Sequence, residues 1–280
     1  MPELPEVETI RGQLEKLIVG KKIASVDVSL PKMVKLSLVQ FKKIVVGSKI
    51  KNIKRRAKIL IFELSNGWSE LVHLKMSGRL IFRPKGAKLQ TQDTKWNHLT
   101  YYFKDGSLLF HNDMRQFGYI KLVETEKLVD FFKSEKLGPE PLDKDFTLDD
   151  FSALLKKRPN IKIKQFLMDP SNIVGIGNIY SDEILFFAGV HPFRRMKDLK
   201  LDEVKKIFKY TKKILIEALN REGSSVDLYL DARGEKGKNV PYLQVYGREG
   251  EKCPNKCGGV IKRLKINGRS AHFCPRCQKL

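Results

Sequence analysis

The sequence predicts a multidomain α+β protein: a β-sandwich opened by one helix, then a helical domain, then a β-hairpin that carries cysteines. Three observations lead to this prediction. Residues 22–123 are mostly short strands with turn residues between them, helical periodicity begins after a stretch rich in proline and glycine at 137–142, and all four cysteines lie in the last 28 residues. We expect the domains at 1–135 for the sandwich, 136–150 for a linker, 151–240 for the helical domain and 241–280 for the hairpin.

The composition indicates a basic protein that binds a polyanion. The 280 residues include 54 Lys and Arg against 32 Asp and Glu, a formal net charge of +22. A charge of this sign and size favours nucleic acid, with the ribosome or a membrane surface as alternatives. No apolar run is long enough to span a membrane, and no signal peptide opens the chain. We therefore expect a cytoplasmic protein, associated with the nucleoid.

The elements of the sandwich follow from residue patterns. Pro5 suits the first position of a helix, and an apolar stripe continues it through Val7, Ile10, Leu14, Leu17 and Ile18. Residues 59–64 are apolar on both faces, which predicts a strand buried between two layers. Turn residues at 65–67 and 104–106 predict hairpins, and the polar stretch 84–97 predicts a long surface loop.

The helical domain has a glycine-containing turn of its own. Gly175 and Gly177 precede a helix expected at 179–188, and the N-terminus of such a helix can bind a phosphate. The Gly-x-Gly pattern is weak by itself, and no strand precedes it as a dinucleotide-binding fold would require. A long helix at 201–219 follows, and then a polar stretch at 224–240, which predicts a disordered segment or a functional lid.

The cysteines give the clearest chemical motif in the chain. Cys253 and Cys257 are separated from Cys274 and Cys277 by sixteen residues. Two closely spaced pairs of this kind predict one zinc ion bound by four thiolates in a closed, structural site. The alternative is two disulfides, which a cytoplasmic location disfavours. Segments 260–266 and 272–273 are expected to form the hairpin, and the sequence implies no organic cofactor.

The first residues have a chemical interpretation beside the structural one. If Met1 is removed, Pro2 becomes a secondary amine with an ordinary pKa of about 7.7–8. Far more of this amine than of a lysine is neutral at pH 7, so it can attack a carbonyl-like carbon and form an iminium. The carboxyl group of Glu3 could transfer a proton. The alternative is that these residues only begin a helix, and both interpretations can hold together.

The wording MPELPEVET resembles the start of the formamidopyrimidine-DNA glycosylases, the bacterial Fpg family that excises oxidised purines. The resemblance extends along nearly the whole chain and includes LGPEPL at 137–142 and NIVGIGNIY at 172–180. It implies a base-excision-repair glycosylase for 8-oxoguanine and formamidopyrimidines that is also an abasic-site lyase acting by β,δ-elimination. It further implies that Pro2 is the nucleophile, that Glu3 is the acid and that Glu6 orients the N-terminus.

The resemblance also assigns residues that open the duplex. Lys58 matches the family's lysine beside the lesion, which contacts a phosphate and transfers a proton. A flipped base leaves a hole in the duplex, and the resemblance implies that Met76 fills it, that Arg115 binds the orphaned partner base and that Phe117 wedges the stack. The segment 224–240 corresponds to a loop that closes over the flipped base.

The resemblance implies further DNA contacts in both halves of the chain. The resemblance places phosphate contacts at His73, Asn178, Tyr246 and Arg269, the last at the tip of the zinc-finger hairpin. Asn178 lies in the family's helix–two-turn–helix motif, and a further contact is expected within 156–162, for which we take Asn160. The sequence departs from the family at Trp96, where a DNA-contacting histidine is usual, and at Lys75, where a small residue is usual.

The resemblance implies a monomer that binds double-stranded DNA with damaged bases and does not associate with membranes. One alternative is the sister family of oxidised-pyrimidine glycosylases, the endonuclease VIII family, whose wording after the Pro-Glu pair differs from LPEVET. The other is a non-catalytic zinc-finger DNA-binding protein, which fits the charge and the cysteines but gives no reason for Pro2-Glu3 at the chain's start.

Overall fold

The computed structural model describes all residues from 1 to 280, and the chain forms two compact units. Unit 1 comprises Met1–Lys136 and Arg221–Val240, and unit 2 comprises Leu137–Asn220 and Pro241–Leu280. None of the helices combines the length and the apolar character that crossing a membrane would require.

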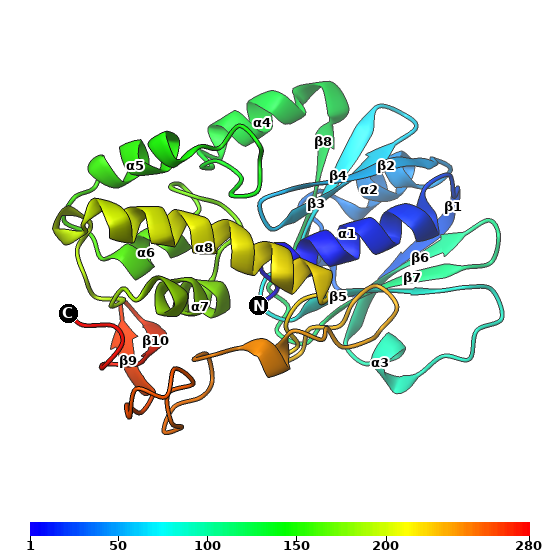
Figure 1. Ribbon diagram of the computed structural model, residues 1–280. Coiled ribbons are helices and arrows are strands. Elements are labelled where there is room, and N and C mark those ends of the chain that lie inside the picture. The colour runs from blue at the N-terminus through cyan, green and yellow to red at the C-terminus, as the bar shows by residue number, and fades with distance from the viewer. The chain divides into compact units, whose positions relative to one another are not determined.

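Unit 1 is the predicted β-sandwich with its N-terminal helix (Figure 1). One antiparallel sheet has the strand order β1-β6-β7-β5 and the other the order β2-β3-β4-β8. The bounds are α1 Leu4–Ile18, β1 Ile23–Val28, α2 Leu38–Val45, β2 Ile50–Arg56, β3 Ile59–Leu64, β4 Trp68–His73, β5 Gly78–Arg83, α3 Thr91–Thr94, β6 Asn97–Phe103, β7 Leu108–Asp113, β8 Tyr119–Glu124 and α4 Leu128–Ser134.

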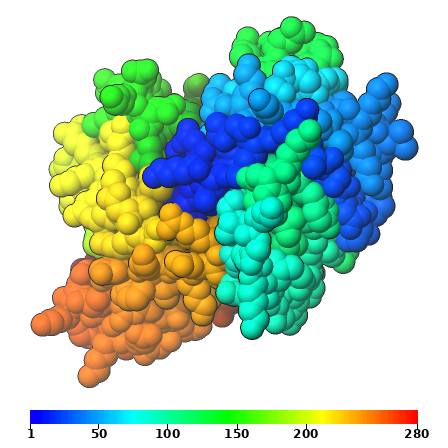
Figure 2. All heavy atoms as spheres, turned by 90° about the vertical axis from the view of Figure 1, so that its right-hand side faces the viewer, coloured from blue at the N-terminus to red at the C-terminus, as the bar shows by residue number.

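Helix α1 packs its apolar stripe into the core of the sandwich. The buried residues Val7, Ile10, Leu14 and Ile18 belong to the same cluster as the inward side chains of both sheets. A proline in the first turn begins the helix, as predicted. The opposite face of α1 lies at the surface, where Figure 2 shows its dark-blue atoms between segments of the two sheets. The packing of α1 into the core of unit 1 therefore fixes the position of the first residues of the chain.

Strand β3 is buried on both faces, as its sequence predicts. Leu60, Phe62 and Leu64 point into the sandwich core. Ile59 and Ile61 point the other way, into a second cluster that also contains Phe131 and Phe132 of α4 and Leu71 of β4. The helix that follows β8 thus supplies the outer layer that a doubly apolar strand requires.

The expectation of a plain surface loop at 84–97 is wrong in one respect. The segment contains the short helix α3, and Asp93 within it is fully buried. Both oxygens of Asp93 pair with the guanidinium of Arg83, at 2.7 Å and 2.9 Å, and one also accepts a hydrogen bond from the backbone of Gln90. A buried carboxylate needs such partners, and they hold the loop against β5.

The segment Arg221–Val240 lies in unit 1, whereas the sequence led us to place it with residues 151–220. Side-chain and backbone hydrogen bonds attach it there. Gln13 of α1 donates to Asp231 at 2.7 Å and accepts from the backbone N–H of Ala232 at 2.9 Å. The backbone N–H of Phe82 in β5 donates to the carbonyl of Ala232 at 2.8 Å. These long-range bonds leave no periodic pattern in the sequence.

Unit 2 contains the helices and the hairpin. Its elements are α5 Leu148–Lys156, α6 Ile163–Met168, α7 Asn178–Ala188, α8 Leu201–Asn220, β9 Lys262–Ile266 and β10 Arg269–Phe273. The helices pack around one apolar core, and the cysteines form a second, small cluster with Phe186 of α7, Val245 and Ile261. The predicted helical domain and zinc-finger hairpin are confirmed.

A buried carboxyl group in the sandwich makes its stability depend on pH. Glu70 on β4 is fully buried and accepts a hydrogen bond from the hydroxyl of Tyr101 at 3.2 Å. Burial raises the pKa of Glu70 to about 8, although the bond from Tyr101 opposes this change. The folded protein therefore keeps this proton up to about pH 8, whereas the unfolded chain releases it near pH 4.5.

We predict that Glu70→Gln stabilises the protein increasingly as the pH rises from 5 to 8. Unfolding of the wild type releases a proton in this window, so its free energy of unfolding falls with pH, by about 1.4 kcal/mol for each unit of pKa difference. The glutamine cannot ionise and escapes this loss. Thermal unfolding of both proteins across this range is the measurement, with the exposed Glu126→Gln as the control. Parallel curves for wild type and Glu70→Gln would contradict the prediction.

Candidate active site and metal centre

The first turn of α1 holds the N-terminal residues in a buried position. Pro2 and Glu3 are both buried. The backbone N–H of Glu3 donates to Oε2 of Glu6 at 2.7 Å. The other oxygen of Glu6, Oε1, accepts from the backbone N–H of Ser224 at 2.7 Å. One buried carboxylate thus connects the start of the chain to Ser224, the first residue of the stretch 224–240 that the sequence predicts to be a disordered segment or a functional lid.

Gly223 is needed where this segment approaches Glu6. A Cβ atom on Gly223 would lie 2.7 Å from Oε1 of Glu6, closer than atoms can pack. Its backbone also adopts φ +83°, a conformation that residues with side chains rarely adopt. Only glycine therefore fits at this close approach to Glu6.

The turn that carries Lys58 is attached to α1. Ala57 and Lys58 form the two-residue connection between β2 and β3, and Ala57 has φ 55°. Nε of Arg55 pairs with Oε2 of Glu8 on α1 at 2.8 Å, and its Nη1 donates to the carbonyl oxygen of Ala57 at 2.8 Å. The helix that positions Pro2 and Glu3 therefore also fixes the backbone next to Lys58.

His73 lies at the end of β4, opposite Ile59 and hence beside the turn of Lys58. Its Nδ1 accepts a hydrogen bond from the backbone N–H of Lys75 at 3.0 Å. Burial, together with the nearby charges of Lys75 and Lys58, lowers the pKa of His73 to about 3. The ring is therefore neutral at pH 7, so a phosphate contact from His73 would use a neutral N–H and add no positive charge.

The residues expected to open the duplex lie on two turns at one end of the sandwich strands. Met76 is in the turn from β4 to β5, and Arg115 and Phe117 are in the turn from β7 to β8. The guanidinium carbon of Arg115 lies 4.9 Å from the centre of the Phe117 ring, whose side chain is 54% exposed. An exposed aromatic ring under a cation presents a flat surface suited to stacking.

Each of these turns contains a non-glycine residue in the left-handed conformation. Lys75 has φ 51° and Gln116 has φ 55°. Trp96, in the neighbouring loop, has φ 60° and packs under Nζ of Lys95 at 4.4 Å. Residues other than glycine seldom adopt this conformation, and the strain tends to occur at functional sites. Lys75 and Trp96 are the two positions at which the sequence departs from the family, and both adopt this left-handed conformation.

In unit 2, Asn178 is the first residue of α7 and follows Gly177 at the helix N-cap. Its Oδ1 atom is buried without a hydrogen-bond partner. The fully buried Lys164 donates to the backbone oxygen of Asn178 at 3.4 Å and pairs with Asp182, one turn further along the helix. These bonds fix the position of the helix N-terminus at which a phosphate would bind.

Two carboxylates of α7 connect the helices to the zinc-finger region. Asp182 accepts hydrogen bonds from the backbone N–H and from Nδ1 of His272 on β10, both at 2.9 Å. Glu183 accepts three backbone N–H bonds, from residues 244, 245 and 246, at 2.8–2.9 Å. Tyr246 also packs against His272, with ring centres 4.9 Å apart. These two acids position Tyr246, and sequence reasoning missed them.

The remaining candidate contacts of unit 2 are exposed. Arg269 is the first residue of β10 and follows a tight turn of Asn267 and Gly268, both in the left-handed conformation. It therefore stands at the tip of the hairpin, as expected. Asn160 is exposed after α5, and its carbonyl oxygen accepts a bond from Arg195 at 3.4 Å.

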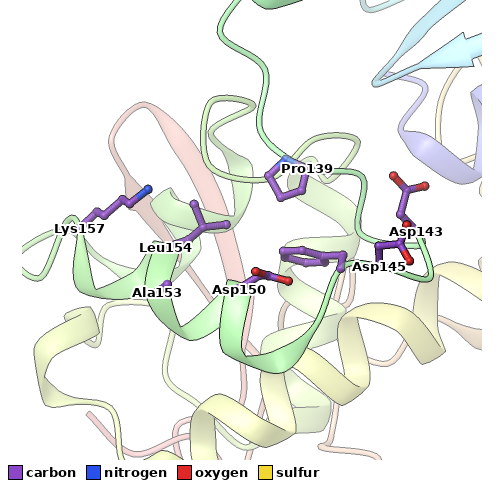
Figure 3. A pocket seen from close by; sticks show the side chains of 8 residues that line it. Pro139, Asp143, Asp145, Asp150, Ala153, Leu154 and Lys157 are labelled. Atoms are coloured by element: carbon purple, nitrogen blue, oxygen red, sulfur yellow. The ribbon is translucent and has the colours of Figure 1, made fainter.

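A hollow of about 390 Å³ lies beside α5, and none of the candidate DNA-contacting residues lines it (Figure 3). It is lined by Asp143, Asp145 and Asp150, and Lys157 stands at the end away from the first two. Three carboxylates repel a phosphate, so this side of α5 is unsuited to DNA. The exposed Asn160, which follows α5, is the better candidate for a DNA contact.

The four cysteines form one cluster that fits a zinc ion. All four Sγ atoms lie within 4.8 Å of one another. The sulfurs of Cys253 and Cys277 are 3.7 Å apart, and those of Cys257 and Cys274 are 3.5 Å apart. A tetrahedral zinc with bonds of about 2.3 Å to sulfur requires separations of roughly 3.8 Å. None of the four is in a disulfide, so the alternative of two disulfides is not what the structure shows.

Glycine is also required beside the cluster. A Cβ atom on Gly259 would lie 2.7 Å from Sγ of Cys274 and 3.2 Å from Sγ of Cys257. The backbone therefore turns closely around the sulfurs, as in a zinc knuckle. Three residues separate Cys253 from Cys257, and all four sulfurs still gather in one cluster.

Three family models match this chain in succession. The formamidopyrimidine-DNA glycosylase N-terminal domain matches residues 1–120, the H2TH domain of the same glycosylase matches 137–229, and the zinc finger found in FPG and IleRS matches 250–280. Curated relatives named formamidopyrimidine-DNA glycosylase include one from Streptococcus pneumoniae, 40% identical over 100% of this chain and 99% of its own. Another, from Lactococcus lactis, is 41% identical over 100% of both chains.

Solved structures give the same result. A complex between the Lactococcus lactis Fpg and DNA containing an abasic site has a TM-score of 0.91 and 39% sequence identity, covering 99% of this chain and 100% of that one. A mutant of the same protein bound to Fapy-dG DNA has a TM-score of 0.91 and 39% identity, covering 100% of both chains.

The fold, the zinc finger and these similarities define a DNA glycosylase that acts on damaged bases in DNA. The chain belongs to the formamidopyrimidine-DNA glycosylase family. Enzymes of this family are glycosylases that also have abasic-site lyase activity. The expected resemblance is confirmed, and the two alternatives, an oxidised-pyrimidine enzyme and a non-catalytic binding protein, are not favoured by these relatives.

We predict one zinc ion per chain, and that its removal costs DNA affinity before it unfolds the sandwich. The cluster around the cysteines contains only three other buried apolar residues, so the metal must supply much of the folding energy of the zinc-finger region, whereas the sandwich has a large core. Metal analysis, DNA binding and circular dichroism during titration with a chelator are the measurements. Freshly reduced protein that folds and binds DNA without metal would refute the prediction.

Proposed function

We propose that this enzyme removes oxidised purines, 8-oxoguanine and formamidopyrimidines, from duplex DNA and then cleaves the strand by β,δ-elimination through a Schiff base on Pro2. The observation that carries the proposal is the buried start of the chain, where Pro2 and Glu3 are both buried and Glu6 accepts a hydrogen bond from the backbone N–H of Glu3. A chain terminus is normally poorly ordered. A terminus fixed inside the protein, with an amine and a carboxyl group side by side in the sequence, suits covalent catalysis.

The proposed reaction begins once Met1 has been removed. The neutral secondary amine of Pro2 attacks the anomeric carbon of the damaged nucleotide, and the bond from that carbon to the base breaks. Glu3 assists by proton transfer. The amine loses its proton, the bond from the anomeric carbon to the ring oxygen breaks as that oxygen is protonated, and the opened sugar remains attached to Pro2 as an iminium. The iminium acidifies the adjacent hydrogen of the sugar, whose loss expels the 3′ phosphate by β-elimination. Loss of a further proton then expels the 5′ phosphate by δ-elimination. Lys58 transfers a proton in this strand cleavage and contacts a phosphate.

The remaining site residues are proposed to hold the opened duplex. Met76 fills the space of the flipped base, Arg115 binds the base left without a partner, and Phe117 wedges the stack. The other proposed DNA contacts are His73, as a neutral donor, and Trp96 in unit 1, with Asn160, Asn178, Tyr246 and Arg269 in unit 2. The Lactococcus lactis protein bound to DNA with an abasic site or Fapy-dG supports this class of substrate.

The proposed functions are distributed among the domains expected from the sequence, with one change. The sandwich of residues 1–135 carries the chemistry, 151–220 and 241–280 carry phosphate contacts, and the segment 221–240 caps the flipped base from its attachment in unit 1. Its bond from Ser224 to Glu6 supports this role. We propose that the enzyme acts as a monomer in the cytoplasm, where bacterial DNA lies.

We predict that an uncleavable tag at the N-terminus abolishes base excision and strand cleavage but preserves DNA binding. The tag converts the Pro2 amine into an amide, which cannot form an iminium, and leaves the phosphate contacts in place. The same tag after Leu280, whose side chain is 80% exposed, is the matched control and should leave both activities intact. Cleavage of an 8-oxoguanine duplex and gel-shift binding are measured for both proteins. Full lyase activity in the N-terminally tagged protein would refute the reaction.

A further inference from the structure

Asp113, the last residue of β7, binds both turns that carry the duplex-opening residues. It is fully buried. Its Oδ1 accepts from the hydroxyl of Ser77 at 2.5 Å and from the backbone N–H of Arg115 at 3.2 Å. Its Oδ2 accepts from the backbone N–H of Gly118 at 2.7 Å. Ser77 follows Met76 directly, and residues 115 and 118 flank Phe117, so one carboxylate joins the two turns.

The backbone of Asp113 extends this connection to a third segment. Its N–H donates to the carbonyl oxygen of Trp96 at 2.9 Å, and its carbonyl oxygen lies 3.0 Å from Nε2 of His98. Ser77 adds a further bond between the turns, because its Oγ also accepts from the N–H of Arg115 at 2.9 Å. Three loops far apart in sequence therefore meet at a single residue.

The bonds to Asp113 surround the two strained positions of these turns. Lys75 and Gln116 are in the left-handed conformation, which is disfavoured for residues with side chains and persists only where the surroundings enforce it. Ser77 lies two residues after Lys75, and the donors at 115 and 118 stand on either side of Gln116. Gly118 leaves room for the carboxylate, because a Cβ atom there would lie 3.0 Å from its Oδ2.

We propose that Asp113 is a positioning residue for lesion recognition, which sets the turn of Met76 and the turn of Arg115 and Phe117 in one fixed relation. The proposal rests on the roles proposed above for those three residues. It requires a carboxylate, because every group that faces its two oxygens is a donor. An asparagine would place its own N–H2 group against one of these donors and lose that bond.

The test compares Asp113→Asn and Ser77→Ala with Ser69→Ala as the matched control. Ser69 is a buried serine of the same sandwich, and its hydroxyl is 2.9 Å from that of Thr125, in a different contact. Single-turnover excision is measured on duplexes that carry 8-oxoguanine opposite each of the four bases. We expect Asp113→Asn to reduce the preference among partner bases by roughly tenfold or more, as for loss of a buried hydrogen bond to a charged group. Ser77→Ala should act in the same direction, and Ser69→Ala should have no effect.

A double variant separates positioning from simple loss of stability. If Asp113 acts through Arg115, then adding Asp113→Asn to Arg115→Ala changes the partner-base preference no further, whereas independent effects would add. The salt dependence of binding to undamaged duplex should also stay unchanged, because Asp113 contacts no phosphate. Should Asp113→Asn fail to fold, Ser77→Ala against Ser69→Ala decides the question alone.

The outcomes distinguish this inference from the proposed function. If Arg115→Ala leaves the partner-base preference intact, the assignment of Arg115 is wrong, and the inference fails with it. If Arg115→Ala abolishes the preference but Asp113→Asn and Ser77→Ala keep it, the inference alone is overturned. Additive effects in the double variant would likewise overturn it, since they would show that Asp113 does not act through Arg115.

Discussion

The proposed catalytic end of this protein depends on the two hydrogen bonds that the buried Glu6 carboxylate accepts. One comes from Glu3, at the start of α1, and the other from Ser224, more than two hundred residues later. The proposed nucleophile belongs to the first residue of the mature chain, and termini ordinarily fray. Chemistry at that position is possible only if the terminus is fixed, and the sandwich core fixes α1 while Glu6 fixes its first turn.

A second constraint is that buried carboxylates organise the site while exposed cations give the chain its charge. Asp113 gathers the two turns of unit 1, and Asp182 and Glu183 attach the zinc-finger region to α7 in unit 2. All three are buried, and each accepts hydrogen bonds from segments that are distant in the sequence. His73, in contrast, carries no charge at pH 7, because burial and the charges of two lysines lower its pKa.

The sequence predicted what depends on local patterns. The apolar stripe of α1, the doubly buried strand β3, the helices α7 and α8 and the four cysteines were all found at the expected places. It did not predict what depends on contacts between distant segments. The attachment of 221–240 to Gln13, the buried pair of Arg83 and Asp93 and the role of Asp113 leave no periodicity, because single hydrogen bonds can join any two residues that the fold brings together. The roles of individual site residues came from family wording, and the structure adds the bonds that hold them.

The central claim is that Pro2, and not one of the many lysines, carries the covalent intermediate. The direct measurement is reduction with borohydride during reaction on an 8-oxoguanine duplex, followed by proteolysis and mass spectrometry of the trapped protein–DNA adduct. The account predicts that the adduct lies on the N-terminal peptide, at the nitrogen of Pro2. An adduct on Lys58 or another lysine, or strand cleavage with no trapped adduct, would contradict it.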